Sequence, residues 1–256
     1  MRYKPAMLAA LITAIEEKKA QLDRLRPMSG EALANLAHAC DLELTYTSNA
    51  IEGNTLTQIE TSLVIEKGIT IGGKKLRDHL EAIDHYEAIA YVRDLAARGS
   101  RLTQSDVRNL HALVVKRSDP DSAGRYATTG RFVSTDTGRH AFPSPAEIPA
   151  LMGDFADWLG SAPATPETAF GAHRRLVDIH PFNDGNGRSA RLLMSLVLIR
   201  GGYPPVAVRP QDRLAYLHAL QQAQAGLGDE DFRGLLYERL DASLAEHLNV
   251  LGMALP

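Results

Sequence analysis

The sequence is poor in several features that would indicate other classes of protein. Cys40 is the only cysteine among 256 residues, which excludes an intrachain disulfide and fits a reducing compartment. The formal net charge is only -3 at pH 7, so we expect no nucleic-acid partner. No apolar run approaches the roughly 18 residues that a membrane-spanning helix needs, and we expect no membrane partner either.

The N-terminus begins like a secretory signal but lacks the rest of one. Arg2 and Lys4 precede an apolar run that ends at Glu16 and Glu17, and no small-residue cleavage site follows. An amphipathic packing helix explains the spacing better, and without a signal we expect a cytoplasmic location. The apolar residues at helical spacing are Leu8, Leu11, Ile12, Ile15, Leu22 and Leu25.

Helical spacing of apolar residues continues along most of the chain. Thr57 with Glu60, and Thr103 with Asp106, form patterns typical of capping boxes at helix starts. Thr165 precedes a proline, which is typical of an N-cap followed by the first helical position. The predicted helices cover about residues 5–25, 31–52, 76–98, 189–200, 212–225 and 229–248, with others starting after Thr57, Thr103 and Thr165.

Residues that favour strands gather in one segment that is also rich in Gly, Thr, Ser and Pro. Tyr126, Phe132 and Val133 lie in it, and we predict a β-hairpin with its turn near Thr137–Gly138. The chain shows no internal repeat and no disordered linker. The predicted fold class is therefore all-α with one small β-hairpin.

The stretch IHPFNDGNGRSAR, residues 179–191, places several polar groups at the start of a helix. NDGNG cannot stay helical, so it predicts a tight loop whose backbone N–H groups and helix dipole form an anion-binding nest. Gly185 and Gly187 let a phosphate approach without a Cβ in the way. Asn186 can add an amide donor, and Arg188 and Arg191, on one helical face, can fork onto phosphate oxygens.

A carboxylate in a phosphate site indicates a metal ion, because like charges would otherwise repel. Mg²⁺ bound by Asp184 and phosphate oxygens, with several waters retained, would resolve this conflict. His180 lies four residues upstream, where a neutral imidazole suits a base that takes a proton from a hydroxyl near pH 7. We expect Phe182 to anchor the loop in the core.

Each of these features has an ordinary structural explanation when taken alone. A histidine before proline is usually a loop residue, Gly-Asn-Gly is usually a turn, and paired arginines often only solvate a helix. Their combination in one register favours phosphate chemistry on a nucleotide. His173 has no visible partner and is interpreted as structural. A metal-dependent hydrolase would need more metal ligands than Asp184 and His180 provide.

The segment HPFNDGNGRSAR resembles the signature of Fic proteins, His-x-Phe-x-(Asp/Glu)-Gly-Asn-Gly-Arg-x-x-Arg, at every fixed position. TIGGKKLRDHLEAIDHYEAI, AFPSPAEIPALM and GGYPPVAV are also similar to this family, which leaves out only about the first 40 and the last 15 residues. The resemblance implies a Fic-type helical bundle that forms one compact unit. It implies an N-terminal helical region at 1–100 and a catalytic core at 101–245 with a flap at about 125–142.

The resemblance also implies an activity, that of a protein adenylyltransferase. Such enzymes move AMP from ATP to a hydroxyl of a target protein and release pyrophosphate. By position, His180 would deprotonate the hydroxyl, and Asp184 would hold Mg²⁺ between the α- and β-phosphates. Asn186 and the glycine amides would hold the phosphates, while Arg188 and Arg191 would neutralise developing charge.

Adenine contacts and target docking are further expectations from the resemblance. Tyr216 and Gln224 stand near the positions where the family often uses a tyrosine and an asparagine, and the glutamine is a departure from that pattern. The hairpin resembles the family's flap, which would pair with the target's backbone as an added strand. The protein itself is a second expected acceptor.

The segment TSNAIEGN resembles the family's inhibitory segment, (Ser/Thr)-x-x-x-Glu-(Gly/Asn), through Ser48, Glu52 and Gly53. It belongs to a predicted helix at about 41–53, upstream of the core, which implies self-inhibition. The carboxylate of Glu52 could pair with Arg191, occupy the place of the γ-phosphate and leave the α-phosphate out of line. The family also implies that this glutamate could orient water to remove AMP from a modified target.

Two other classes of function stay open at this point. The same scaffold could transfer UMP, phosphocholine or phosphate, although the intact Gly187 and Arg188 favour ATP in the AMP-transferring direction. A non-enzymatic nucleotide-sensing or toxin–antitoxin module is the second alternative, and the intact His180 argues against it. Proteins of this family often form homodimers, and dimerisation could release Glu52.

Overall fold

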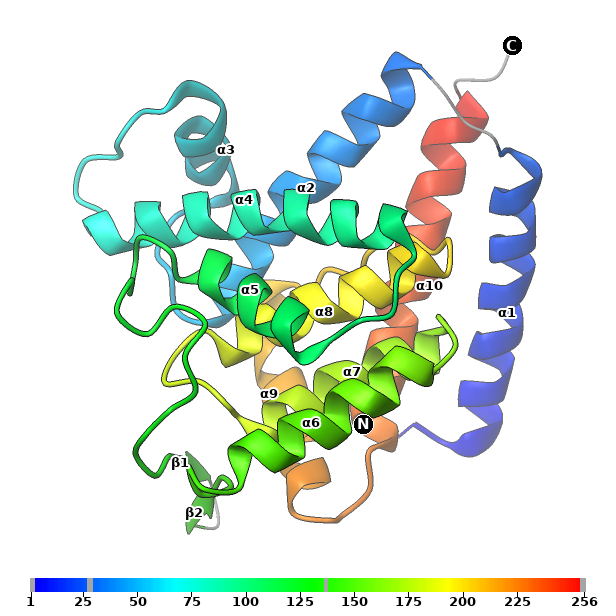
Figure 1. Cartoon of the computed structure of the whole chain (residues 1–256). Coiled ribbons are helices and arrows are strands. Elements are labelled where there is room, and N and C mark those ends of the chain that lie inside the picture. The colour runs from blue at the N-terminus through cyan, green and yellow to red at the C-terminus, as the bar shows by residue number, and fades with distance from the viewer. Residues whose placement is uncertain (1–2, 27–29, 136–137, 254–256) are drawn as a thin grey trace.

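The computed structural model describes residues 3–26, 30–135 and 138–253, which form helices and one small sheet (Figure 1). The predicted all-α class with one β-hairpin is confirmed. The described elements are α1 (Pro5–Arg24), α2 (Glu31–Ile51), α3 (Gln58–Lys67), α4 (Leu76–Arg98), α5 (Gln104–Val114), β1 (Phe132–Thr135), β2 (Gly138–Ala141), α6 (Ile148–Ser161), α7 (Pro166–Ile179), α8 (Asn186–Arg200), the short 3-10 helix η1 (Pro210–Asp212), α9 (Arg213–Gln224) and α10 (Glu230–Met253).

Three helices begin at the caps that the sequence predicts. The hydroxyls of Thr57 and Thr103 accept hydrogen bonds from the N–H groups of Glu60 and Asp106, whose carboxylates accept bonds in return. Thr165 caps α7 with its hydroxyl, and a proline follows at the first helical position. Each such cap satisfies a free backbone donor and stabilises the fold by about 1 kcal/mol. The cap on α7 matters most for the site, because the other end of this helix carries His180.

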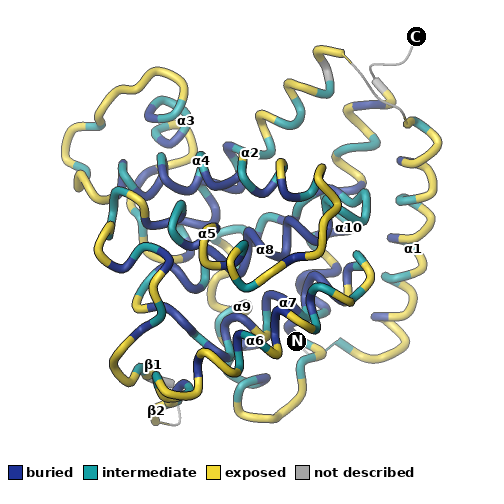
Figure 2. The backbone as a smooth tube through the Cα atoms, viewed as in Figure 1, coloured by how far each residue is buried: buried dark blue, intermediate teal, exposed yellow. Residues whose placement is uncertain are grey.

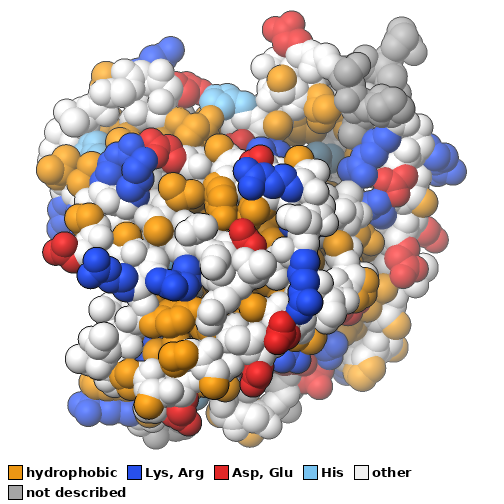
Figure 3. Space-filling view, viewed as in Figure 1, with side chains coloured by type: hydrophobic (Ala, Val, Ile, Leu, Met, Phe, Trp, Pro, Cys, Tyr) orange, Lys and Arg blue, Asp and Glu red, His pale blue; other side chains and the backbone are white. Residues whose placement is uncertain are grey.

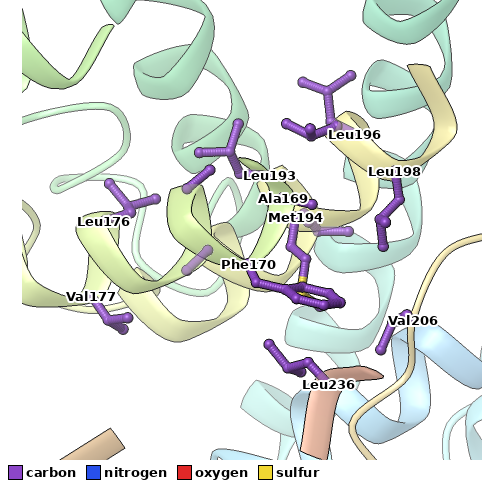
Figure 4. Packing of buried hydrophobic residues seen from close by; sticks show 14 of the residues in the cluster. Ala169, Phe170, Leu176, Val177, Leu193, Met194, Leu196, Leu198, Val206 and Leu236 are labelled. Atoms are coloured by element: carbon purple, nitrogen blue, oxygen red, sulfur yellow. The ribbon is translucent and has the colours of Figure 1, made fainter. Parts of the chain in front are cut away.

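Helix α8 is the centre of the core, as its leucine content predicts. Almost every residue from Asn186 to Leu198 is buried, and Figure 2 shows this dark segment surrounded by other helices. Its main neighbours are α7 and α4. Figure 4 shows Met194 of α8 beside Phe170 of α7, while Leu196 of α8 lies farther from the α7 side chains. The end of α7 and the start of α8 meet at the NDGNG loop, and Arg77 near the start of α4 contacts Asp184 in that loop.

The hairpin projects from the helical body beside the start of α6 (Figure 1). Its strands are antiparallel, with Phe132 opposite Ala141 and Val133 opposite His140, so the predicted hairpin is confirmed. The prediction was wrong for Tyr126, which lies outside both strands because its ring packs near Phe182 instead, with centroids 5.7 Å apart. Gly138 begins β2, whereas Thr137, the other residue of the expected turn, lies outside the described residues.

The outer layer of the molecule is formed partly by α1, which runs along α10 in Figure 1. One buried apolar cluster contains residues from Leu8 of α1 to Leu251 of α10. On the face shown in Figure 3, basic and acidic side chains are interspersed. Within 3–26, 30–135 and 138–253, no helix has the length and apolarity that crossing a membrane would require.

Candidate active site

The loop between α7 and α8 turns sharply at two residues with positive φ. His180 ends α7 with φ 49° and ψ 55°, and Gly185 precedes α8 with φ 73°. His180 is the one non-glycine residue in this left-handed region within the described part of the chain. The conformation costs about 1 kcal/mol for an L-residue, and such strain is commonly found at functional sites. A Cβ on Gly185 would lie 2.9 Å from Val115, so glycine is needed there for space as well.

Two buried side chains fix the shape of this loop from inside. The side-chain oxygen of Asn186 accepts from the Phe182 N–H at 3.0 Å, and its amide donates to the Phe182 carbonyl at 2.8 Å. Asn186 therefore braces the loop, whereas the sequence predicted an amide aimed at phosphate. Phe182 is fully buried, as expected, and stacks on His111 with centroids 3.7 Å apart.

His111 is a loop-holding residue that the sequence did not single out. Its Nδ1 accepts from the Gly124 N–H at 3.0 Å, so its Nε2 must carry the proton. That Nε2–H donates to the Asp184 carbonyl at 2.9 Å. Burial lowers the pKa of His111 to about 4, which keeps the ring neutral and this tautomer fixed near pH 7.

His180 is held between the flap and α7. Its ring stacks on Phe142, with centroids 3.9 Å apart, and its carbonyl accepts a hydrogen bond from Arg131, whose other nitrogen donates to the Pro143 carbonyl at 2.8 Å. Burial lowers the pKa of His180 to about 4, and the charge of Arg131 contributes to the lowering. The Val177 backbone acts in the opposite direction, although Nδ1 of His180 makes no hydrogen bond of good geometry. The imidazole is therefore neutral near pH 7, as a general base must be.

Asp184 lies at the mouth of the loop with 43% of its side chain exposed. Its Oδ1 accepts from the Gly185 N–H at 2.6 Å, and its Oδ2 accepts from Arg77 of α4 at 2.5 Å. Burial alone would raise the pKa of Asp184, but Arg188, the Gly185 N–H and Arg77 lower it below its usual range. The carboxylate is thus ionised and partly accessible.

Arg188 is a buried cation with incomplete partners. Its side chain is 2% exposed, and two of its nitrogens, Nε and Nη1, have no hydrogen bond. The nearest carboxylates are those of Glu81, 3.4 Å from Nη1, and Asp184, 3.3 Å from Nη2. Because buried guanidinium groups are normally well bonded, this one is suited to take an additional anion.

Arg191 is also buried, and its partners come from α2. Its Nε donates to the Ser48 hydroxyl and its Nη2 to the Ser48 carbonyl, both at 2.9 Å. The same Nη2 donates to Oε1 of Glu52 at 2.7 Å. Burial alone would lower the pKa of Arg191, but Glu52 and Tyr216 raise it. The structure therefore brings the two predicted segments, Ser48–Gly53 and 179–191, into contact.

The carboxylate of Glu52 lies directly over the glycine of the anion nest. A Cβ built on Gly187 would be 2.3 Å from Oε1 of Glu52 and 3.1 Å from Nη1 of Arg191. Gly53 follows with φ 94°, which ends α2 and lets the chain turn away from the site. One anionic group of this chain thus occupies the place that the sequence predicts for a phosphate.

The two residues predicted to contact adenine are engaged elsewhere. Tyr216 is 1% exposed, and its hydroxyl lies 2.7 Å from Nε2 of His173. His173 is structural, as interpreted, and this hydroxyl is the partner that the sequence did not reveal. Gln224 faces Asp178. Burial raises the pKa of Asp178, and Arg174 and Gln224 partly offset this rise. Tyr216 thus has almost no free surface, whereas Gln224 is half-buried.

A metal ion at this site would depend on phosphate and water for most of its ligands. The described residues contain no group of three or more His, Cys, Asp or Glu side chains that could hold a metal. One ionised and accessible carboxylate, Asp184, fits Mg²⁺, which usually takes one or two carboxylates beside substrate phosphates. Arg77 would have to leave Oδ2 of Asp184 for this ligation.

Four of the residues that build the site were not singled out from the sequence: Arg77, Glu81, His111 and Arg131. They lie 49 or more positions from the residues they contact in the 179–191 motif. Their identities are ordinary for helix and loop surfaces, so only the packing of α4, α5 and the flap against the loop reveals them.

Comparison with known proteins agrees with this geometry. A family model described as Fic/DOC family matches residues 101–198. A curated relative from Nematostella vectensis, named Protein adenylyltransferase Fic, is 37% identical over 221 residues, which is 84% of this chain and 51% of the relative. The chain thus spans about half the length of the curated relatives it matches.

Solved structures give the same assignment over nearly the whole chain. A Fic-domain-containing signalling protein from Bacteroides thetaiotaomicron is 33% identical with a TM-score of 0.84, covering 93% of this chain and 96% of that one. Fic-1 from C. elegans is 30% identical with a TM-score of 0.83, covering 96% of this chain and 72% of that one. With its signature loop, its helical bundle and these relatives, the chain belongs to the Fic family.

Proposed function

We propose that the protein is an autoinhibited adenylyltransferase that moves AMP from ATP to a hydroxyl group of a target protein. One observation carries the proposal: a neutral histidine stands beside an anion nest whose buried arginines are held by a carboxylate of the same chain. Relatives named protein adenylyltransferase support AMP as the transferred group.

His180 is the proposed general base. Nδ1 is buried, which leaves Nε2 as the atom that accepts the hydroxyl proton while the oxygen attacks the α-phosphorus and pyrophosphate leaves. The stacking on Phe142 and the bond from Arg131 hold the ring and its backbone, so little reorganisation is needed. The lowered pKa keeps the base unprotonated near pH 7.

The phosphates of ATP are the proposed occupants of the nest at the start of α8. Backbone N–H groups near Gly187 would meet them without a Cβ, and Arg188 and Arg191 would supply charge-assisted hydrogen bonds. Asp184 would hold Mg²⁺, which neutralises phosphate charge when bound. Asn186 contributes by keeping the loop in shape rather than as a ligand.

Glu52 is the proposed inhibitory group. Its carboxylate takes the hydrogen bond of Arg191 and the space above Gly187 that a phosphate needs. The hydroxyl and carbonyl of Ser48 accept hydrogen bonds from Nε and Nη2 of the same guanidinium. Ser48 and Glu52 together therefore accept three hydrogen bonds from Arg191. An ATP molecule that binds despite this contact would have its phosphates displaced, and about an ångström of misplacement costs on the order of 100-fold in rate.

The hairpin is the proposed docking site for the target. Within the described residues the hairpin is a sheet of two strands, β1 and β2, and a target segment would add to it as a third strand. Phe132 is 55% exposed beside Arg139, which offers an apolar and a charged contact at the same place.

Self-modification and homodimer formation are also proposed. A sedimentation coefficient that rises with protein concentration would support the dimer.

Label incorporation from ATP tests the proposed reaction. Wild type and Glu52→Gly are incubated with Mg²⁺ and either α-labelled or γ-labelled ATP, with His180→Ala as the inactive control. We expect label only from the α position, with much more in Glu52→Gly than in wild type. Label from the γ position would contradict AMP transfer and indicate a kinase-type reaction.

A second candidate is transfer of a different nucleotide on the same scaffold. Tyr216 is buried and Gln224 faces Asp178, so recognition of adenine by these two residues stays a prediction and another base is a candidate. The same assay with α-labelled UTP, CTP and GTP distinguishes the two. Preference for ATP would remove the alternative, and preference for another nucleotide would replace AMP transfer.

A further inference from the structure

The last turn of α2 places Glu52 in the anion nest, so the order of this turn matters for the site. The last four carbonyl groups of any α-helix have no partner within the helix. In α2 all four are satisfied. The Asn49 carbonyl accepts from the N–H groups of Glu52 and Asn54, and the Ala50 carbonyl accepts from the Gly53 N–H. The other two carbonyls depend on distant side chains.

Those two side chains are both arginines. Arg191 donates to the Ser48 carbonyl at 2.9 Å, and Arg213, the first residue of α9, donates from Nε to the Ile51 carbonyl at 2.7 Å. The last turn of α2 carries no basic residue of its own. Because the C-terminal end of a helix is its negative pole, both guanidinium groups stabilise this end of α2 by charge as well as by hydrogen bonding.

The two arginines differ in what ATP does to them. Arg191 belongs to the proposed phosphate site, so its bonds to α2 are in competition with the nucleotide. Arg213 donates to a backbone carbonyl outside that site, so this bond has no such competitor. Arg213 itself is exposed, and the preceding Asp212 anchors the start of α9 by accepting from the Arg209 N–H at 3.2 Å and from Arg239 at 2.5 Å.

We propose that Arg213 is a positioning residue for inhibition, which keeps the last turn of α2 ordered and thereby holds Glu52 over Gly187. This inference rests on the proposed function, because it assigns Arg213 an effect on AMP transfer only through Glu52. Loss of the bond leaves the Ile51 carbonyl without a side-chain partner, frays the turn and lowers the occupancy of the nest by the carboxylate.

The test compares Arg213→Gln with wild type, Glu52→Gly and the double variant, using auto-modification from α-labelled ATP. Arg98→Gln is the matched control, because Arg98 is an exposed arginine that forms an ion pair with Asp94 in its own helix. We expect Arg213→Gln to raise the rate about 2- to 5-fold, which is what an exposed charge at a helix terminus is commonly worth. Arg213→Lys, which keeps the charge, should restore much of the inhibition.

The double variant and hydrogen exchange separate positioning from a general structural role. In the Glu52→Gly background, Arg213→Gln should leave the rate unchanged, and the amides of Glu52, Gly53 and Asn54 should exchange faster in Arg213→Gln than in wild type. If Glu52→Gly is active while Arg213→Gln behaves like wild type in rate and exchange, the inference is overturned. If Glu52→Gly itself shows no activation, the proposed autoinhibition fails instead.

Discussion

Gly187 is proposed to leave space both for the Glu52 carboxylate and for a phosphate of ATP, and its replacement by alanine tests both roles. A Cβ there would lie 2.3 Å from Oε1 of Glu52, whereas such contacts are normally no closer than about 3.4 Å, so the carboxylate must retreat by about 1 Å. The 2.7 Å bond from Arg191 to Glu52 would then exceed hydrogen-bond range. Since 42% of the Glu52 side chain is exposed, we expect this to weaken inhibition by only about 1 kcal/mol.

The same methyl group would also stand where a phosphate is expected to approach. Gly187→Ala should therefore lose the inhibitory contact without gaining activity. In the Glu52→Gly background, which clears the site, Gly187→Ala should weaken ATP binding about 10- to 100-fold, because charge-assisted bonds to phosphate are each worth about 1.5–3 kcal/mol.

Titration calorimetry with ATP and Mg²⁺ measures this effect on Glu52→Gly and on Glu52→Gly/Gly187→Ala. Gly153→Ala is the matched control, because Gly153 is also helical and a Cβ there meets nothing within 4 Å. Equal ATP affinity with and without the Gly187 methyl would refute the placement of phosphate over this residue. Strong label incorporation by the single Gly187→Ala variant would refute it as well.

Three further results are expected. His180→Ala should abolish transfer while ATP binding, measured by calorimetry, persists; substantial residual transfer would remove His180 from the role of base. Arg191→Ala should weaken ATP binding and release α2, seen as faster amide exchange at Glu52, and unchanged values for both would contradict the Arg191–Glu52 contact. Burial lowers the pKa of His173 to about 3 and that of His180 to about 4, so the folded state binds fewer protons than the unfolded state. The free energy of unfolding should thus be highest above about pH 6.5 and fall as the pH drops toward 4, by about 2 kcal/mol per histidine at pH 5. Equal free energies of unfolding in urea at pH 8 and pH 5 would contradict this. The exposed His218, replaced by Gln, serves as the control.

Local signals in the sequence account for the helices and for most of the motif. Capping boxes at Thr57 and Thr103 and helix stops such as Gly99 act within a few residues, so they can be recognised without knowledge of the fold. The anion nest at 185–191 is local for the same reason. The approach of Glu52 to Arg191 was predictable only from the resemblance of TSNAIEGN to a known segment.

The parts that the sequence did not reveal depend on contacts between distant elements. Asn186 was expected to face phosphate, but its amide matches the two backbone groups of Phe182 in the folded loop. Tyr216 was expected to contact adenine, but packing of α9 against α7 directs its hydroxyl to His173. Arg77 and Arg131 lie in segments that are similar to the family, but neither was singled out, because an arginine becomes part of a site only when another element is packed beside it.

The burial of α8 has a consequence for how this protein can be controlled. A helix enclosed from Asn186 to Leu198 cannot shift without repacking its neighbours, so Arg188 and Arg191 act as a stationary frame. A change between the inhibited and active states must therefore come from parts that can move relative to α8: the C-terminal end of α2, the side chain of Arg77, or the hairpin. In a variant that lacks the Glu52 carboxylate, a synthetic carboxylate or phosphonate shaped like the end of Glu52 would meet two arginines that are already in place, and would lose little affinity to rearrangement of α8.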